Sequence, residues 1–194
     1  MADIRSVCLY CGSSSRVPES HKAAAIRLGA LLGEASIRLI YGGGRVGLMG
    51  LAADGALSAG GEVVGIIPDF LDEREVGHPG LTELHVVDSM HARKQLMFEM
   101  ADAFCILPGG IGTLDETFEI LSWRQLGLHD KPILVVDQDG YWKPLSALLG
   151  HAVATGYVQP AHVAALTVVA SVEDVPMALA NAPDPRLPGM AGRL

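Results

Sequence analysis

The sequence predicts an α/β fold in which a doubly wound parallel sheet carries helices on both faces. Short apolar runs alternate with helix-like stretches along nearly the whole chain, which is the pattern of a parallel sheet with crossover helices. Two of these runs end in glycine-rich loops that precede a helix. The 194 residues, 49% of them hydrophobic, suffice for one domain with a full core.

The elements follow from composition and from local start and stop signals. We expect strands, rich in Val, Ile and Leu, at residues 4–10, 37–41, 62–68, 83–87, 103–107, 132–136 and 166–170. We expect helices at residues 18–34, 48–59, 90–101, 113–125, 141–154 and 172–181. Pro18 suits a first helical turn, and Ser89 can cap the helix that follows it. Residues 1–182 should form a single domain, and the proline-rich residues 183–194 should be a mobile tail.

The net charge of −8 and the isoelectric point near 5.2 argue against binding to nucleic acid or to an anionic membrane. No run reaches the length of a membrane span, and the first residues lack the features of a signal peptide, so we expect a cytoplasmic protein. Cys8 and Cys11 form a C-x-x-C pair that could be a redox or metal site. Against this, Cys8 lies inside a predicted strand and no second pair completes a zinc site, so we expect no metal.

The segment 108–116, Pro-Gly-Gly-Ile-Gly-Thr-Leu-Asp-Glu, follows a predicted strand and opens a helix at about Thr113. Its glycines let a ligand approach the backbone, and the helix start offers unpaired N–H groups, so the segment predicts a phosphate site. Glu116 should lie in the first helical turn. There it either complements the helix dipole or faces the ligand.

A second glycine loop offers an alternative function, the binding of a dinucleotide cofactor. Residues 42–50 contain G-x-G-x-x-G after a strand, and Glu62 lies about twenty residues further on, which is the spacing of a dinucleotide site with its ribose-binding acid. Against a nicotinamide or flavin cofactor, the pattern lies on the second strand, whereas the fingerprint usually lies on the first. The lysine of a P-loop is also absent, so a bound phosphate would anchor the ligand rather than react.

Other loops should meet these two at the carboxyl edge of the sheet, because ligands of open parallel sheets bind there. They are the serine-rich loop with Ser14 and the loop at residues 69–81. Arg93 and Lys94 lie near the start of the helix at residues 90–101, where cations oppose the helix dipole. They could bind an anion or could simply be solvated.

These motifs together resemble the LONELY GUY family of cytokinin-activating phosphoribohydrolases, long labelled lysine decarboxylase-like. The resemblance covers the chain up to about Ala182. It rests on Cys-Gly-Ser-Ser at residues 11–14, the glycines of residues 41–50, Met-His-Ala-Arg-Lys at residues 90–94 and the complete P-G-G-x-G-T-x-x-E signature at residues 108–116.

The resemblance implies a Rossmann-like fold, a homodimer, no cofactor, and hydrolysis of N6-modified AMP, with plain AMP as a further substrate, to free base and ribose 5-phosphate. It implies that Arg93 and Glu116 carry catalysis. The positions implied to contact the nucleotide or to shape its site are Ser14, Gly42, Gly43, Gly44, Glu75, Met90, Arg93, Lys94, Gly109, Gly110, Ile111, Gly112, Thr113, Leu114 and Asp115. A nucleotide carrier without catalysis and a dinucleotide-dependent oxidoreductase remain alternatives. The older decarboxylase label would require a pyridoxal-type cofactor on a lysine, and nothing in the sequence calls for one.

Overall fold

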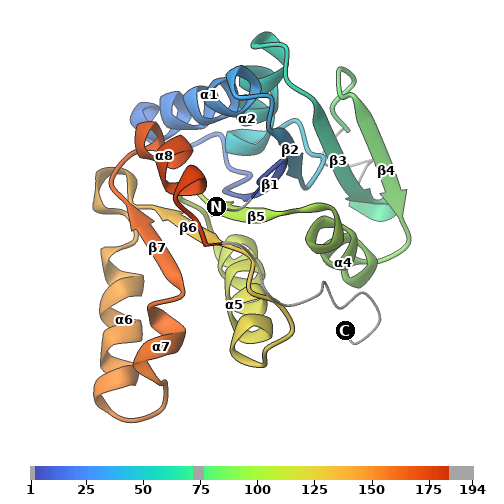
Figure 1. Ribbon diagram of the computed structural model, residues 1–194. Helices are drawn as coiled ribbons and strands as arrows, with labels where there is room; N and C mark the ends of the chain where they lie inside the picture. Colours follow the sequence, from blue (N-terminus) through green and yellow to red (C-terminus); the bar gives the residue numbers. More distant parts are fainter. Residues whose placement is uncertain (1–2, 72–76, 184–194) are drawn as a thin grey trace.

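The computed structural model describes residues 3–71 and 77–183, and over these ranges the chain forms one parallel sheet covered by helices (Figure 1). The seven strands of the described residues are β1 (Ser6–Tyr10), β2 (Arg38–Tyr41), β3 (Val63–Pro68), β4 (Glu83–Val87), β5 (Ala103–Ile106), β6 (Ile133–Val136) and β7 (Leu166–Val169). Every pairing is parallel, in the order β4-β3-β2-β1-β5-β6-β7. The predicted fold class and each predicted strand are confirmed.

The helices divide between the two faces of the sheet. They are α1 (Glu19–Glu34), α2 (Gly47–Ser58), α4 (Met90–Met100), α5 (Ile111–Gln125), α6 (Lys143–Ala154), the short α7 (Pro160–Val163) and α8 (Val175–Ala180), with 3₁₀ turns η1 (Gln138–Gly140) and η2 (Val172–Asp174). One core cluster joins the sheet to α1, α2 and α8, and another joins its opposite face to α4, α5 and α6 (Figure 1). Successive residues of β1 enter opposite cores, since Val7 and Leu9 lie in the first cluster and Cys8 and Tyr10 in the second.

The order of the strands reverses beside β1. Strands β2, β3 and β4 extend the sheet to one side, and the chain then returns through α4 to place β5 on the other side of β1. Such a reversal separates the loops that follow the two central strands and leaves a crevice between them at the carboxyl edge. The crevice therefore lies between the loop after β1 and the glycine loop after β5.

Three sequence expectations change at helix starts. Helix α8 begins at Val175 rather than at Val172, because the 3₁₀ turn η2 occupies the three residues before it. Helix α5 begins at Ile111 rather than near Thr113, because Gly110 adopts an extended backbone and serves as its N-cap. Helix α6 begins at Lys143, because η1 and its turn occupy the residues before it. The expected cap of α4 is confirmed, since the hydroxyl of Ser89 accepts a hydrogen bond from the N–H of Ala92. Residues 184–194, which hold nearly all of the predicted tail, lie outside the described residues, as do residues 72–76.

His129 makes the core beneath α5 sensitive to acid. Its side chain is 2% exposed, Nε2 donates to the carbonyl of Ile120 at 2.7 Å, and the ring packs edge-on against Phe98. Burial lowers the pKa of His129 to about 4. Since the folded protein then binds fewer protons than the unfolded chain, stability is complete above the ordinary histidine pKa near 6.5 and falls as the pH drops toward about 4.

We expect this protonation to remove up to about 3 kcal/mol of unfolding free energy between about pH 6.5 and pH 4. Urea unfolding at a series of pH values measures it. The control is His129→Gln, which can still donate to Ile120 but does not titrate, so its stability should fall less steeply over this range. Parallel curves for the two proteins would exclude His129 as the cause.

Candidate active site at the carboxyl edge of the sheet

The predicted loops meet at the carboxyl edge of the sheet. The N–H of Gly12 donates to the carbonyl of Pro108 at 3.1 Å, and the N–H of Leu48 donates to the carbonyl of Gly12 at 3.0 Å. The N–H of His78, at the end of the loop before β4, donates to the carbonyl of Gly43 at 3.2 Å. Backbone contacts therefore join the loops after β1, β2 and β5 and the described end of the 69–81 loop, as the parallel topology predicts.

The start of α5 has the backbone arrangement that the predicted anion site requires. The first helical hydrogen bond runs from the N–H of Leu114 to the carbonyl of Gly110, so the N–H groups of Ile111, Gly112 and Thr113 have no partner within the helix. Gly109 must be glycine here, since a Cβ would lie 2.1 Å from the hydroxyl oxygen of Thr113. The helix dipole and the unpaired N–H groups together favour a phosphate at this point.

Glu116 lies in the second turn of α5, because the helix starts earlier than the sequence predicted. The expectation that this residue occupies the first turn, where it could complement the helix dipole, is therefore wrong. Burial raises the pKa of Glu116 to about 7. The positive charges of Arg93 and Lys94 oppose this rise, and the negative charges of Asp115 and Glu119 add to it. A carboxyl group that titrates near neutral pH is suited to accept a proton from water.

Arg93 is buried, with only 6% of its surface exposed, and is held by one backbone carbonyl in β3 and one just after β2. Its Nη2 donates to the carbonyl of Gly42 at 2.8 Å, and its Nε donates to the carbonyl of Ile66 at 3.1 Å. Its Nη1 lies 3.7 Å from the sulfur of Met90. The alternative that Arg93 is a solvated charge is therefore wrong. No ion pair joins it to Glu116, so these two described residues act on each other only through their charges.

Lys94 points between α4 and α5. Its Nζ lies 2.8 Å from a carboxylate oxygen of Glu119 and 3.3 Å from one of Asp115. Burial lowers the pKa of Lys94, but the hydrogen bonds and charges of Glu119 and then Asp115 outweigh this, so the pKa lies above its ordinary value. Lys94 is also not a solvated charge. It forms part of a charged cluster on the side of α5 that carries Glu116.

Other predicted residues lie in the loops after β1 and β2. Gly42, Gly43 and Gly44 are buried, and Gly43 has a positive φ of 78°, which glycine adopts without strain. Gly44 forms an antiparallel bridge with Gly77, and Ser14 is exposed beside the glycine loop. Glu75 lies outside the described residues.

A pocket of about 400 Å³ opens on the α1 side of the glycine loop. Ser13, Ser14, Arg16, His21, Gly109 and Tyr141 are among the residues that line it. The hydroxyl of Tyr141 donates to the carbonyl of Gly109 at 2.7 Å, so this side chain supports the loop from the far side. Sequence reasoning missed Tyr141, because its partner lies 32 residues away and only its place after β6 hinted at the crevice.

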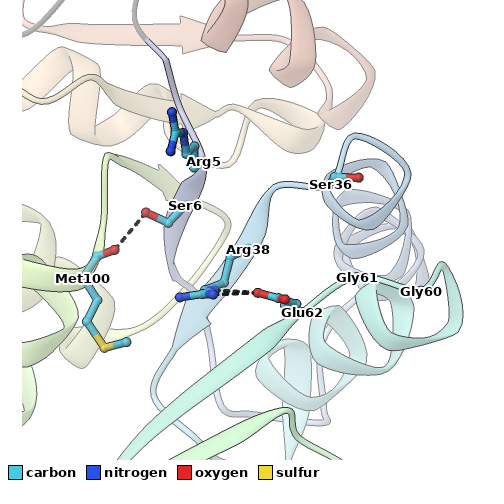
Figure 2. A pocket seen from close by; sticks show the side chains of 8 residues that line it. All are labelled: Arg5, Ser6, Ser36, Arg38, Gly60, Gly61, Glu62 and Met100. Atoms are coloured by element: carbon cyan, nitrogen blue, oxygen red, sulfur yellow. Dashed lines mark hydrogen bonds and ion pairs between the residues drawn. The ribbon is translucent and has the colours of Figure 1, made fainter.

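Glu62 lies at the wrong edge of the sheet for the dinucleotide alternative. It precedes β3 and pairs with Arg38 at the start of β2, with 2.7 Å between the charged groups. Figure 2 shows both side chains in a pocket of about 450 Å³ that also contains Arg5 and Ser6. In a dinucleotide site the ribose-binding acid lies at the carboxyl edge. The spacing of Glu62 is therefore coincidental, and this pocket lies at the amino edge, away from the glycine loops.

The C-x-x-C pair is part of the core. Cys8, Cys11 and Cys105 are all buried and free. Burial raises the pKa of Cys105 to about 12 and raises those of Cys8 and Cys11 well above the ordinary range. Thiols that stay protonated are poor nucleophiles, so the redox alternative loses its support. Among the described residues, no group of three or more His, Cys, Asp or Glu side chains is placed to hold a metal ion.

Comparison with known proteins identifies the family of the chain. A sequence profile of the family described as "Possible lysine decarboxylase" matches residues 49–179. A cytokinin riboside 5′-monophosphate phosphoribohydrolase of Rhodococcoides fascians is 44% identical over 170 residues, which are 87% of this chain and 86% of that protein. The chain belongs to the LONELY GUY family. A further member, the cytokinin riboside 5′-monophosphate phosphoribohydrolase LOG1 of Arabidopsis thaliana, is 42% identical over 80% of this chain and 73% of its own length.

Solved structures with the same fold are more distant from this LONELY GUY family member. The protein TM1055 superposes with a TM-score of 0.70 at 23% identity, over 92% of this chain and 100% of that one. The molybdenum cofactor carrier protein of Chlamydomonas reinhardtii superposes with a TM-score of 0.69 at 19% identity, over 91% and 96%. At these identities the similarity shows the Rossmann-like fold alone.

Gly42 should be required in this LONELY GUY site, because a Cβ there would lie 1.9 Å from Nη2 of Arg93 and 2.9 Å from Cζ. Gly42→Ala would push the guanidinium off its two carbonyl acceptors. We expect a loss of stability of about 1–3 kcal/mol and at least a roughly tenfold loss of turnover. Thermal melting and kinetics measure the two effects. The control is Gly150→Ala in α6, where a Cβ meets nothing within 4 Å. Equal behaviour of the two variants would contradict the assignment.

Proposed function

We propose that the protein is a phosphoribohydrolase that hydrolyses the N-glycosidic bond of cytokinin riboside 5′-monophosphates and of AMP. The products are the free base and ribose 5-phosphate. The observation that carries this proposal is the placement of Glu116, a carboxyl group with a pKa near 7, one turn beyond the free N–H groups at the start of α5. Relatives at 42–44% identity carry this activity in their names, which supports the same substrate class here.

In the proposed mechanism the 5′-phosphate binds the N–H groups of Ile111, Gly112 and Thr113. This anchors the ribose beside Glu116 and converts binding energy into orientation. As the base leaves, positive charge develops on the ribose, and the Glu116 carboxylate stabilises it. The same carboxylate orients and deprotonates the attacking water, whose oxygen bonds to C1′ as the C–N bond breaks. The water proton passes to Glu116, and the base leaves with the electrons of the C–N bond and takes up a proton from solvent. Glu116 then releases its proton to solvent, which restores the enzyme.

Arg93 has a supporting role in this mechanism. Two of its N–H groups are engaged by Gly42 and Ile66, and the rest of its guanidinium faces the thioether of Met90. Arg93 therefore holds a fixed positive charge beside Glu116, which limits repulsion between the phosphate and the carboxylate. The remaining guanidinium donors can contact the nucleotide directly.

We further propose a homodimer in the cytoplasm. Ile111 is 82% exposed and Phe118 lies on the same side of α5, so this helix presents apolar surface beside the site. Light scattering tests the dimer, and a monomer mass at micromolar concentration would contradict it.

The three free cysteines fit the reducing environment of the proposed cytoplasmic location. Within the described ranges, no helix is long and apolar enough to cross a membrane.

Product analysis tests the proposed reaction. The protein is incubated with AMP, with N6-isopentenyl-AMP and with the matching riboside, and the products are separated by chromatography. Free base and ribose 5-phosphate in equal amounts from the monophosphates, with the riboside untouched, would support the proposal. Release of inorganic phosphate with intact nucleoside would indicate a phosphatase. Nucleotide that stays bound and unchanged would favour the carrier alternative.

A further inference from the structure

Glu119 is a charged residue of the site that neither the motifs nor the family resemblance singles out. It lies on α5 three residues after Glu116, so the two side chains share one side of the helix. Its carboxylate makes the closer of the two contacts to Lys94, 2.8 Å against 3.3 Å for Asp115. Glu119 is also better shielded from solvent than Asp115, with 24% of its side chain exposed against 60%. Glu119 is therefore the principal anchor of the Lys94 amine.

The charges around Glu116 come from two helices, α4 and α5. Arg93 and Lys94 face it from α4, and Asp115 and Glu119 lie beside it on α5. Cys8 and Tyr10 of β1, and Cys11 just after it, lie close enough for the charge of Glu116 to raise their pKa values, and burial keeps all three groups neutral. Two cations thus face three carboxylates. Because Lys94 is engaged by Glu119, only Arg93 remains as a cation without a carboxylate of its own in this cluster.

We infer that Glu119 is a positioning residue of the active site: it fixes the Lys94 amine between α4 and α5 and keeps a negative charge beside Glu116. This inference rests on the proposed function. In the resting enzyme the bridge stops the lysine from moving onto the carboxylate of Glu116. It also holds the amine at the edge of the site, where a bound nucleotide can meet it without a search through side-chain rotamers.

Two substitutions separate these two effects. Glu119→Gln keeps a carbonyl oxygen that can accept from Lys94 but removes the negative charge. The pKa of Glu116 should then fall by about half a unit or more, because a like charge has gone. Glu119→Ala removes both the charge and the acceptor. Lys94 should then lose its position, so KM for the monophosphate should rise about three- to tenfold.

The test follows Glu116 directly and through turnover. Carboxyl ¹³C NMR gives the midpoint of the Glu116 titration in wild type and in Glu119→Gln, and the pH dependence of base release gives the acid limb of the rate. Both should move to lower pH in Glu119→Gln, whereas its KM should stay close to wild type. Glu99→Gln is the control, since it removes an equal charge from the exposed partner of Gln95 near the end of α4. It should move neither midpoint nor KM.

An unmoved Glu116 midpoint in a folded Glu119→Gln protein would overturn the inference, and so would an unchanged KM in a folded Glu119→Ala protein. If Glu119→Ala does not fold, the Glu116 midpoint in Glu119→Gln still tests the inference. That variant should fold, because its amide oxygen can still accept a hydrogen bond from Lys94. The two proposals fail differently. An absence of base release from wild type would defeat the proposed function, whereas an active wild type with no shift in Glu119→Gln would defeat only the role of Glu119.

Discussion

Replacing Glu116 by glutamine should lower the release of free base by at least about a hundredfold while the protein still folds and binds the nucleotide. The amide keeps the shape of the side chain but can neither stabilise a developing positive charge nor take a proton from water. In the proposed mechanism the phosphate binds backbone N–H groups of α5, which the substitution does not touch. Single-turnover release of base, with calorimetric binding of the monophosphate, measures both effects.

The same variant should be more stable than wild type at high pH. The pKa of Glu116 is raised to about 7 in the folded protein, so the folded state holds a proton that the unfolded chain releases from about pH 4.5 upward. Stability from this group is therefore complete below about pH 4.5 and is lost as the pH rises to about 7. At about pH 8, Glu116→Gln should gain about 1–3 kcal/mol, and near pH 4.5 almost nothing. Thermal melting at the two pH values measures this, and turnover near that of wild type would refute the catalytic role.

Arg93→Ala should show the largest combined loss of activity and stability. It removes both donors from the carbonyls of Gly42 and Ile66, leaves space in a buried region and takes the fixed positive charge away from Glu116. We expect a loss of about 2–4 kcal/mol in unfolding free energy and at least about a hundredfold in kcat/KM. Kinetics and urea unfolding give the two values.

Arg93→Lys separates charge from geometry. A lysine keeps the positive charge, but its single ammonium group cannot reproduce the planar fork that reaches two carbonyls at once. It should retain more stability than Arg93→Ala and still lose about tenfold or more in turnover. The control is Arg27→Ala, which removes an exposed arginine paired with Glu34 and Glu173 and should change little. An Arg93→Lys enzyme as active as wild type would show that charge alone suffices.

The fold was predictable because it depends on local pattern. Residues such as Val7, Ile40 and Ile106 lie in strands buried on both faces, and such strands are continuous apolar runs in the sequence. The convergence of the glycine loops was also predictable, since parallel strands end at one edge. The start of α5 was misplaced because Gly110 and Gly112 are poor helix formers, and only the backbone shows that Gly110 is the cap.

The site itself was only partly predictable. Local sequence patterns cannot predict which carbonyls bind Arg93, because Gly42 and Ile66 are 51 and 27 residues away in the chain. Glu62 was misinterpreted for a related reason: a count of residues along the chain does not say which end of a strand a side chain reaches. Only one local feature of the sequence indicated the proposed role of Glu119, namely its position three residues after Glu116. Its partner Lys94 lies on another helix, so their contact could not be predicted. Burial, which sets the pKa of Glu116, is a property of the packed structure.

The most direct test of the site is a crystal structure of the Glu116→Gln protein with N6-isopentenyl-AMP bound. If the start of α5 anchors the substrate, the 5′-phosphate will accept hydrogen bonds from the N–H groups of Ile111, Gly112 and Thr113. C1′ of the ribose will then lie beside the side chain at position 116, with the guanidinium of Arg93 facing the same space. A nucleotide bound elsewhere, for instance in the pocket of Arg5 and Arg38, or one whose C1′ points away from position 116, would contradict this assignment.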